Sequence, residues 1–194
     1  MMLQDLILAN RSYRSFDMSA PVPHSVLTAM VEAARFSPSS INLQPLCFYL
    51  VEGAEACAQM LPLTGWARNL PDLKLPPAGH APTAYIVICQ DLTIAENPTR
   101  FNRDVGIVAQ SMMLAAVEAG FGGCMIGNFR PDAVADALSL DMAHYLPQLI
   151  LALGKPDEKI YLTDLAPGEK SAYYRDEENR HFVPKRRLED LIIS

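Results

Sequence analysis

Apolar residues recur at helical spacing in several parts of the chain. Residues 23–36 place an apolar face on one side of an amphipathic helix (Val26, Leu27, Met30, Val31 and Ala34). Residues 104–119 are apolar on nearly every side, which predicts a helix buried in the core or in a subunit interface. Gly120 is expected to cap that helix. Shorter periodic stretches predict further helices over 1–9, 54–61 and 131–138.

Continuous apolar runs between these helices predict strands over 46–51, 84–89 and 149–153. The run from Ala84 to Cys89 is rich in β-branched residues and reads as a central strand buried on both faces. Gly154 is expected to end the last core strand. Helices and strands alternate, so the pattern predicts an α/β or α+β class.

The length of 194 residues, half of them hydrophobic, fits one globular domain. Residues 1–194 are therefore assigned to one domain, in which 155–194 form a polar C-terminal arm. Within it, 181–188 are basic and extended, and 188–193 end the chain as a strand or helix.

The net charge of -6 argues against a nucleic-acid-binding surface. Eight of the 16 Lys and Arg residues nevertheless lie at or after Lys155, where an anionic ligand could find positive charge. The four cysteines and four histidines are scattered, so we expect buried thiols and no metal site. No signal peptide or membrane-spanning run is apparent, which predicts a cytoplasmic protein.

Two segments carry more polar chemistry than a connection requires. The loop over 37–45 holds three serines, Asn42, Gln44 and two prolines, Pro38 and Pro45, and suits either a neutral heterocycle or a plain turn. Arg11 and Arg14 flank Ser12 and can converge on one anion, or can lie at a solvated helix end.

The glycines of 120–127 have a dinucleotide-like spacing, but they close a helix and open a strand, which is the reverse of a Rossmann turn. We instead expect these glycines to let the chain pass close to a flat group. Residues 62–82 are rich in Pro and Gly and predict an irregular cap, in which Trp66 reads as a packing anchor and Lys74 has no assigned role.

Taken in order, these segments resemble the FMN-dependent nitroreductase family. The resemblance rests on Arg11-Ser12-x-Arg14-x-Phe16, on Pro38-Ser39-Ser40-x-Asn42-x-Gln44-Pro45, on the helix and Gly-rich strand of 104–127, and on the basic tail. It implies an α+β fold, with a mainly antiparallel sheet flanked by helices, and an intertwined homodimer with FMN at the interface. The arm would reach the partner subunit.

The resemblance also implies which residues bind FMN. One subunit would supply Arg11, Ser12 and Arg14, and the other Pro38, Ser39, Ser40 and Asn42. Lys185 and Arg187 would hold the phosphate, with Arg186 as the alternative to Arg187, while Ile126 and Gly127 would pass by the isoalloxazine face.

The chain departs from the family pattern in three places. Asn10 stands where many members have a basic residue, Leu46 stands where an aromatic residue often follows Gln-Pro, and residues 62–82 are short. The first departure weakens the expected phosphate binding, and the others leave the substrate range open.

The implied activity is a ping-pong reaction in which NADH or NADPH reduces FMN and an electrophile such as a nitroaromatic or quinone is then reduced. No nucleophile set or paired carboxylates are apparent, which fits an enzyme whose cofactor is the reactive group. Arg14 would favour the reduced form of the flavin, because a guanidinium near N1 keeps its positive charge. The alternatives are FMN storage or sensing without turnover, reductive dehalogenation, and flavin breakdown.

Overall fold

The computed structural model describes residues 2–67, 70 and 72–193, and its centre is a five-stranded antiparallel sheet. The strands are β1 (Phe16–Asp17), β2 (Leu46–Glu52), β3 (Ala84–Asp91), β4 (Gly122–Ile126) and β5 (Tyr145–Pro156). Strands β2, β3 and β5 lie side by side in that order. Strands β4 and β1 also pair with β5, each with a different part of it. The mainly antiparallel sheet expected from the family resemblance is confirmed.

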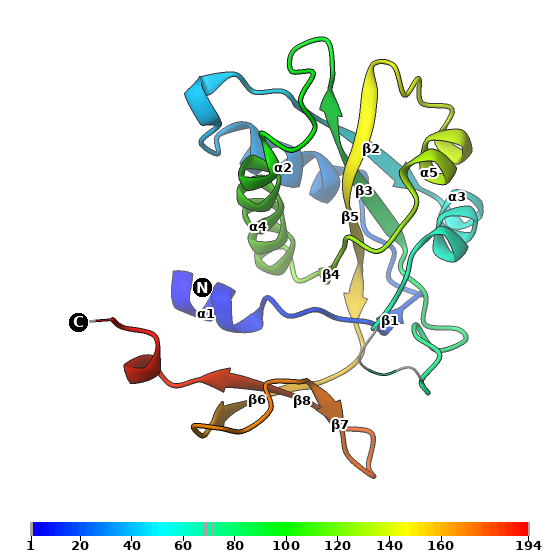
Figure 1. The fold of residues 1–194 in the computed structure, drawn as a ribbon. Coiled ribbons are helices and arrows are strands. Elements are labelled where there is room, and N and C mark those ends of the chain that lie inside the picture. The colour runs from blue at the N-terminus through cyan, green and yellow to red at the C-terminus, as the bar shows by residue number, and fades with distance from the viewer. Residues whose placement is uncertain (1, 68–69, 71, 194) are drawn as a thin grey trace.

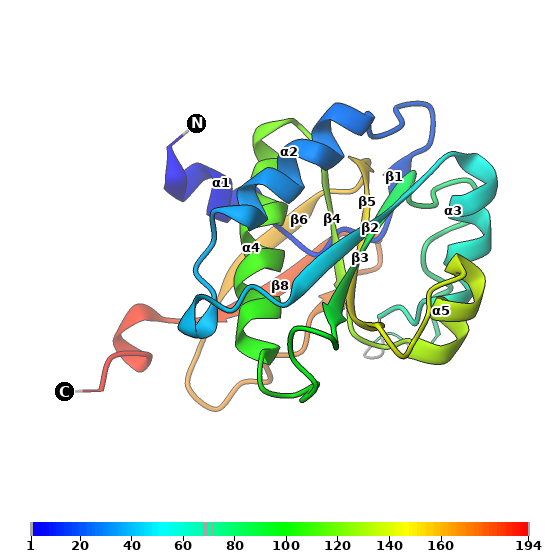
Figure 2. The same ribbon diagram turned by 90° about the horizontal axis from the view of Figure 1, so that it is seen from above.

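Helices cover both faces of this sheet (Figures 1 and 2). On one face lie α2 (His24–Arg35) and α4 (Asn102–Glu118), and on the other lie α3 (Ala54–Met60) and α5 (Pro131–Leu138). The short α1 (Leu3–Ala9) packs beside α4. Short 3₁₀ turns follow α2 and α3 as η1 (Ser40–Asn42) and η2 (Leu61–Leu63).

Strand β3 divides the core into two layers, as its continuous apolar run predicted. Ile86 and Ile88 point into the cluster beneath α2 and α4, whereas Tyr85 and Val87 point into the cluster beneath α3 and α5. All four side chains are fully buried. The predicted central strand is therefore confirmed.

Helix α4 buries only one side, although its sequence is apolar almost all round. Val108, Met112 and Ala116 pack on the sheet, whereas Ile107 and Gln110 on the outer side stay exposed in this single chain. Ala119 caps the helix, and the predicted cap Gly120 is the next residue, with a φ of +81° that favours glycine.

Gly154 does not end the last core strand, so that expectation was wrong. Strand β5 continues to Pro156 and pairs with β1 over its final two residues. A Cβ atom on Gly154 would lie 2.8 Å from the ring of the fully buried Phe16. Glycine is needed there because two segments approach closely.

The arm forms a small second sheet from β6 (Ile160–Leu165), β7 (Tyr174–Arg175) and β8 (His181–Arg186), which lies below the main sheet in Figure 1. Strand β8 pairs parallel with β6 and antiparallel with β7. The chain then ends in η3 (Leu188–Asp190). The segment predicted to be extended at 181–188 is a strand over 181–186, and Leu188 belongs to η3.

The predicted cap over 62–82 has no helix or named strand after η2 among the described residues, so it is irregular as expected. Arg68, Asn69 and Pro71 of this segment lie outside the described residues. Trp66 packs against the cluster under α3 and α5 and donates a hydrogen bond to Thr64 Oγ1 at 2.8 Å, which fits a packing anchor. In the described part of the chain, no helix is long and apolar enough to cross a bilayer.

Candidate functional site

A cavity of about 250 Å³, here called the cationic pocket, opens between the segment after α1 and the arm. Its basic lining comes from Arg11, Arg14 and Lys185, which are far apart in the sequence. Ser12 belongs to the same wall, and the complete lining is Asn10, Arg11, Ser12, Arg14, Ile160, Tyr173, His181, Val183 and Lys185. The fold therefore brings the N-terminal motif and one residue of the basic tail together.

The two arginines of the motif are held in different ways. Arg14 is 8% exposed, and its guanidinium lies 4.7 Å from the centre of the Tyr173 ring and donates to the Ser12 carbonyl at 3.2 Å. Arg11 donates to the carbonyls of Ile7 and Asn10 at the end of α1, which favours a positive charge there. Arg11 thus acts at a helix end and also lines the pocket.

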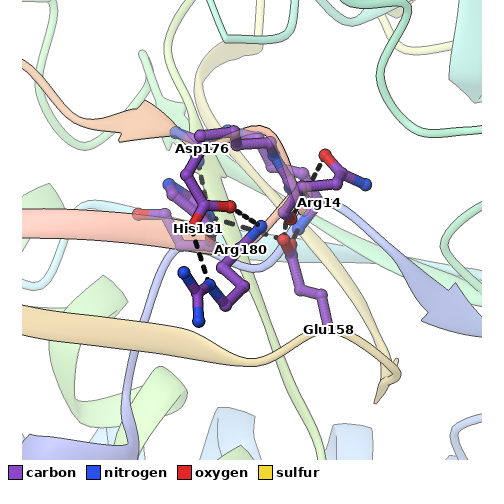
Figure 3. A network of polar contacts seen from close by, with 8 residues as sticks. Arg14, Glu158, Asp176, Arg180 and His181 are labelled. Atoms are coloured by element: carbon purple, nitrogen blue, oxygen red, sulfur yellow. Dashed lines mark hydrogen bonds and ion pairs between the residues drawn. The ribbon is translucent and has the colours of Figure 1, made fainter.

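Behind the pocket lies a buried polar network that the sequence did not reveal (Figure 3). The Glu158 carboxylate accepts hydrogen bonds from the backbone N–H of Arg14 and from the guanidinium of Arg175. The side chains of Glu158 and Arg175 are only 7% and 10% exposed. The network therefore ties the N-terminal motif to the arm.

Burial alone would raise the pKa of Glu158, but its polar contacts outweigh that effect. The neighbouring His181, the Arg14 N–H and the Arg175 charge together hold the pKa of this carboxyl below its usual value. His181 Nδ1 lies 3.4 Å from Glu158 Oε2 but forms no hydrogen bond with it. Among the described residues, neither buried ring nitrogen has a hydrogen-bond partner, and the only charged contact is that of Nδ1 with Glu158, although the side chain lines the pocket.

The polar loop after α2 is organised by a buried carboxylate on α4. Asp104 accepts hydrogen bonds from Ser39 Oγ at 2.7 Å and from the Ser40 N–H at 2.9 Å. Ile41, Asn42 and Gln44 all have φ between 51° and 56°, a region that a β-branched residue such as Ile rarely adopts. Such strain is concentrated at functional sites in many proteins, so the loop is a candidate for ligand contact.

Within one chain this loop does not meet the cationic pocket. Pro38 and Ser39 line a separate cavity of about 210 Å³ beside α2 and α4, and the two cavities share no lining residue. Ser40 and Asn42 are exposed and line neither. Figure 1 shows the loop near the start of α4, whereas α1 and the arm lie toward the other end of that helix.

The remaining candidates lie outside the cationic pocket. Ile126 is 3% exposed as a whole residue and belongs to the core under α3 and α5, whereas Gly127 is exposed with open space around it. Arg187 lies 3.9 Å from Glu189, and Arg186 donates to the Asp190 carbonyl. Of the three basic residues at 185–187, the fold places Lys185 with the N-terminal motif.

The glycines at the start of β4 have a structural role. A Cβ on Gly123 would lie 2.1 Å from the Ala152 carbonyl oxygen, and one on Gly122 would lie 2.8 Å from the Tyr13 ring. Glycine is needed at both positions because the protein's own chain passes close by. The spacing had instead suggested a close approach to a flat ligand.

Comparison with known proteins gives consistent matches. The model of the nitroreductase family matches residues 7–155. The chain is 23% identical over 205 residues to "Putative NAD(P)H nitroreductase YdgI" of Bacillus subtilis, covering 88% of this chain and 96% of that protein.

Solved structures share the fold at low identity. One is a nitroreductase structure from Exiguobacterium sibiricum in complex with FMN, with a TM-score of 0.70 and 20% identity over 86% of this chain and 94% of that one. Another is CLA-ER, an enone reductase of gut-bacterial fatty acid saturation, with a TM-score of 0.65 and 21% identity over 81% and 90% of the two chains.

Proposed function

This chain belongs to the nitroreductase family, and from that premise we propose that it is an FMN-dependent NAD(P)H oxidoreductase that reduces nitroaromatic, quinone or similar electrophilic acceptors. The observation that carries the proposal is the cationic pocket. It joins Arg11, Ser12 and Arg14 of the N-terminal motif to Lys185 of the arm. A relative matched over most of its length is named for NAD(P)H, and a structural neighbour contains FMN.

The chemistry of the pocket fits a phosphorylated flavin. Arg11 and Lys185 offer charged donors for a phosphate, to which guanidinium and ammonium groups form strong charge-assisted hydrogen bonds. The buried His181 adds two ring nitrogens that form no hydrogen bond within the described part of the chain, of which Nδ1 lies near Glu158 and Nε2 has no such neighbour. Unpartnered buried polar atoms are rare, and a bound ligand is one explanation for them.

A second copy of the chain is needed to complete this site. The cationic pocket holds about 250 Å³, below the roughly 300–1,000 Å³ typical of ligand sites. We therefore propose a homodimer in which Pro38, Ser39, Ser40 and Asn42 of one subunit reach the flavin held by the other.

The exposed apolar surface supports this dimer. Several large apolar side chains on α1, on η1 and at the C-terminal end are more than half exposed in the single chain: Leu3, Leu8, Ile41, Leu188 and Ile192. A contiguous exposed apolar patch marks an interaction site, and the proposed dimer would bury these side chains against the partner subunit. Light scattering on the purified protein should give twice the mass of one chain, and the mass of one chain at micromolar concentration would contradict the dimer.

The residues of the chain would bind and tune the cofactor, and the flavin, when bound, supplies the two-electron transfer. Arg14 is proposed to place its fixed charge near N1 and the C2 carbonyl, where negative charge gathers on reduction. Lys185 is proposed to hold the phosphate, with Arg187 a further candidate that lies outside the pocket in one chain. Gly127, which is exposed, and its neighbour Ile126 are proposed to pass beside the ring system.

The test begins with the absorption spectrum of the purified protein. We expect a yellow protein with about one FMN per chain, which oxidises NADH or NADPH faster when a nitroaromatic or quinone is added. Lys185→Ala should lose FMN on dialysis, whereas Lys170→Ala, an exposed lysine outside the cationic pocket, should retain it. A colourless protein that takes up no FMN would refute the proposal, and FMN binding without NAD(P)H oxidation would favour storage.

A further inference from the structure

The largest of the cavities described here, called the arm cavity, lies next to the cationic pocket and has no assigned ligand. We propose that it binds the phosphorylated adenosine end of the electron donor and makes the enzyme prefer NADPH to NADH. This inference rests on the proposed function and adds the donor preference to it. The cavity holds about 520 Å³, within the roughly 300–1,000 Å³ typical of ligand sites, and lies between residues 73–80 and the arm.

The lining of the arm cavity carries an excess of positive charge. Lys74, Lys159, Arg175 and Arg180 line the cavity together with Asp157 and Glu158, so the lining residues alone sum to 4 - 2 = +2 when His80 is neutral, while two further acids, Asp176 and Glu178, contact Arg180 from outside the lining. The arginines are committed to ion pairs, Arg175 to Glu158 and Arg180 to Asp176 and Glu178. The remaining acid, Asp157, pairs with His80.

The two lysines are the groups left to bind a ligand. Neither Lys74 nor Lys159 has an ion-pair partner among residues 2–67, 70 and 72–193, and both are exposed. The Nζ atom of Lys159 lies 5.0 Å from the centre of the Tyr161 ring. Two ammonium groups suit a phosphomonoester, which carries about -1.5 to -2 charge at neutral pH.

The rest of the wall suits a flat heterocycle. Leu73, Leu75 and Pro77 supply apolar surface from one segment, and the half-buried Tyr161 adds an aromatic side chain from β6. Ligand sites commonly combine such apolar walls with a few charged groups. An adenosine with a phosphate on its ribose meets both requirements.

The position of the cavity also fits the donor. Ser15 lines the arm cavity, whereas its neighbour Arg14 lines the cationic pocket. Glu158 belongs to the arm cavity and accepts the Arg14 N–H, so the buried network of Figure 3 forms the partition between them. The arm cavity therefore adjoins the pocket assigned to FMN and leaves that pocket to the flavin.

Three other cavities carry no comparable excess of positive charge. The charged lining residues of the cavity beside α2 and α4 are Arg35 and Asp104. The cavity at the end of β2 has one charged lining residue, Glu52, and the cavity near η3 has Arg186, Glu169 and Asp190. A chain with a net charge of -6 repels a polyanionic dinucleotide except where basic residues gather. With the cationic pocket given to FMN, the arm cavity is the remaining candidate of these five.

The direct test is binding of adenosine 2′,5′-bisphosphate to the FMN-loaded protein, followed by calorimetry. We expect the bisphosphate to bind more tightly than adenosine 5′-monophosphate. The Lys74→Gln/Lys159→Gln double variant should weaken bisphosphate binding by about tenfold or more, the loss of one charge-assisted hydrogen bond or more. Lys170→Gln makes the same charge change outside the cavity and should bind as the wild type does.

Steady-state kinetics give the second readout. The double variant should raise the KM for NADPH by about tenfold and leave the KM for NADH, kcat and FMN content unchanged, while Lys159→Arg should keep the preference. Equal KM values for the two donors in the wild type, no binding of the bisphosphate, or equal losses for both donors would overturn the inference. Failure of the proposed function is distinguishable, because it appears as absence of FMN.

Discussion

Substituting Glu158 by Gln tests the buried network directly. Glutamine keeps the size of the side chain and an oxygen that can accept the Arg14 N–H, but it removes the charge opposite Arg175. Because Arg175 is 10% exposed at its side chain, its charge then stays buried without an anion. Breaking a buried ion pair from one side typically costs about 3–5 kcal/mol.

The expected effect on thermal unfolding follows from the size of the chain. For domains of this length, about 1 kcal/mol shifts the melting temperature by about 2–4 °C, so Glu158→Gln should lower Tm by about 6–20 °C. The assay is circular dichroism or calorimetry at neutral pH and a fixed FMN concentration, because a bound ligand raises Tm by itself. A second variant, Glu158→Gln/Arg175→Met, removes both charges and should recover a large part of the loss.

The matched control is Glu32→Gln on α2. Glu32 pairs with Arg35, and both side chains are more than half exposed, so this variant should leave Tm unchanged. If Glu158→Gln lowers Tm no more than Glu32→Gln does, the ion pair is not desolvated as described. If the double variant is as unstable as the single one, the loss comes from packing and the electrostatic explanation is wrong.

Three further predictions concern potential, pH and packing. Arg14→Ala should lower the midpoint potential of bound FMN by about 30–65 mV, because a charge-assisted hydrogen bond of about 1.5–3 kcal/mol is lost and about 1.4 kcal/mol corresponds to 30 mV. Arg14→Lys should keep much of that potential in a spectroelectrochemical titration, and an unchanged potential with simple loss of FMN would make Arg14 a structural or phosphate residue. Because the pKa of Glu158 is lower when folded than unfolded, its contribution to stability should be complete above its unfolded pKa and lost as the pH falls through the folded value, so Tm in acid should fall less steeply for Glu158→Gln than for the wild type. Gly154→Ala should destabilise by about 1–3 kcal/mol in urea unfolding, because the new Cβ would lie 2.8 Å from Phe16, and wild-type stability would contradict that contact.

The parts of the fold that the sequence predicted are those with local apolar periodicity. The 131–138 helix has the predicted bounds, and the helices and strands around the core begin and end within a few residues of their predicted ends. These elements bury a whole face or both faces, so their patterns are strong. The arm strands differ, because β6 alternates half-buried and exposed residues over a short length and pairs in parallel with β8 across an intervening segment.

The backbone of the 37–45 loop could not be predicted from residue preferences. Ile is among the residues least suited to a positive φ, yet Ile41 has a φ of 51°. Asp104 stabilises that turn by accepting two hydrogen bonds across 64 and 65 residues of sequence. Its position in the first turn of α4 reads in the sequence only as a helix-start residue, so its second role depends on the tertiary fold.

The same reasoning explains why the site extends past the end of the family match at residue 155. Glu158, 144 residues from Arg14, fixes the Arg14 backbone, and Tyr173 lies against its guanidinium. Strand β8 supplies Lys185 and the buried His181 to the same pocket. The N-terminal motif thus provides one wall and the arm another, and neither forms the pocket alone. We infer that the arm is part of the single domain, so a substitution that detaches it should release FMN even where the N-terminal motif is intact.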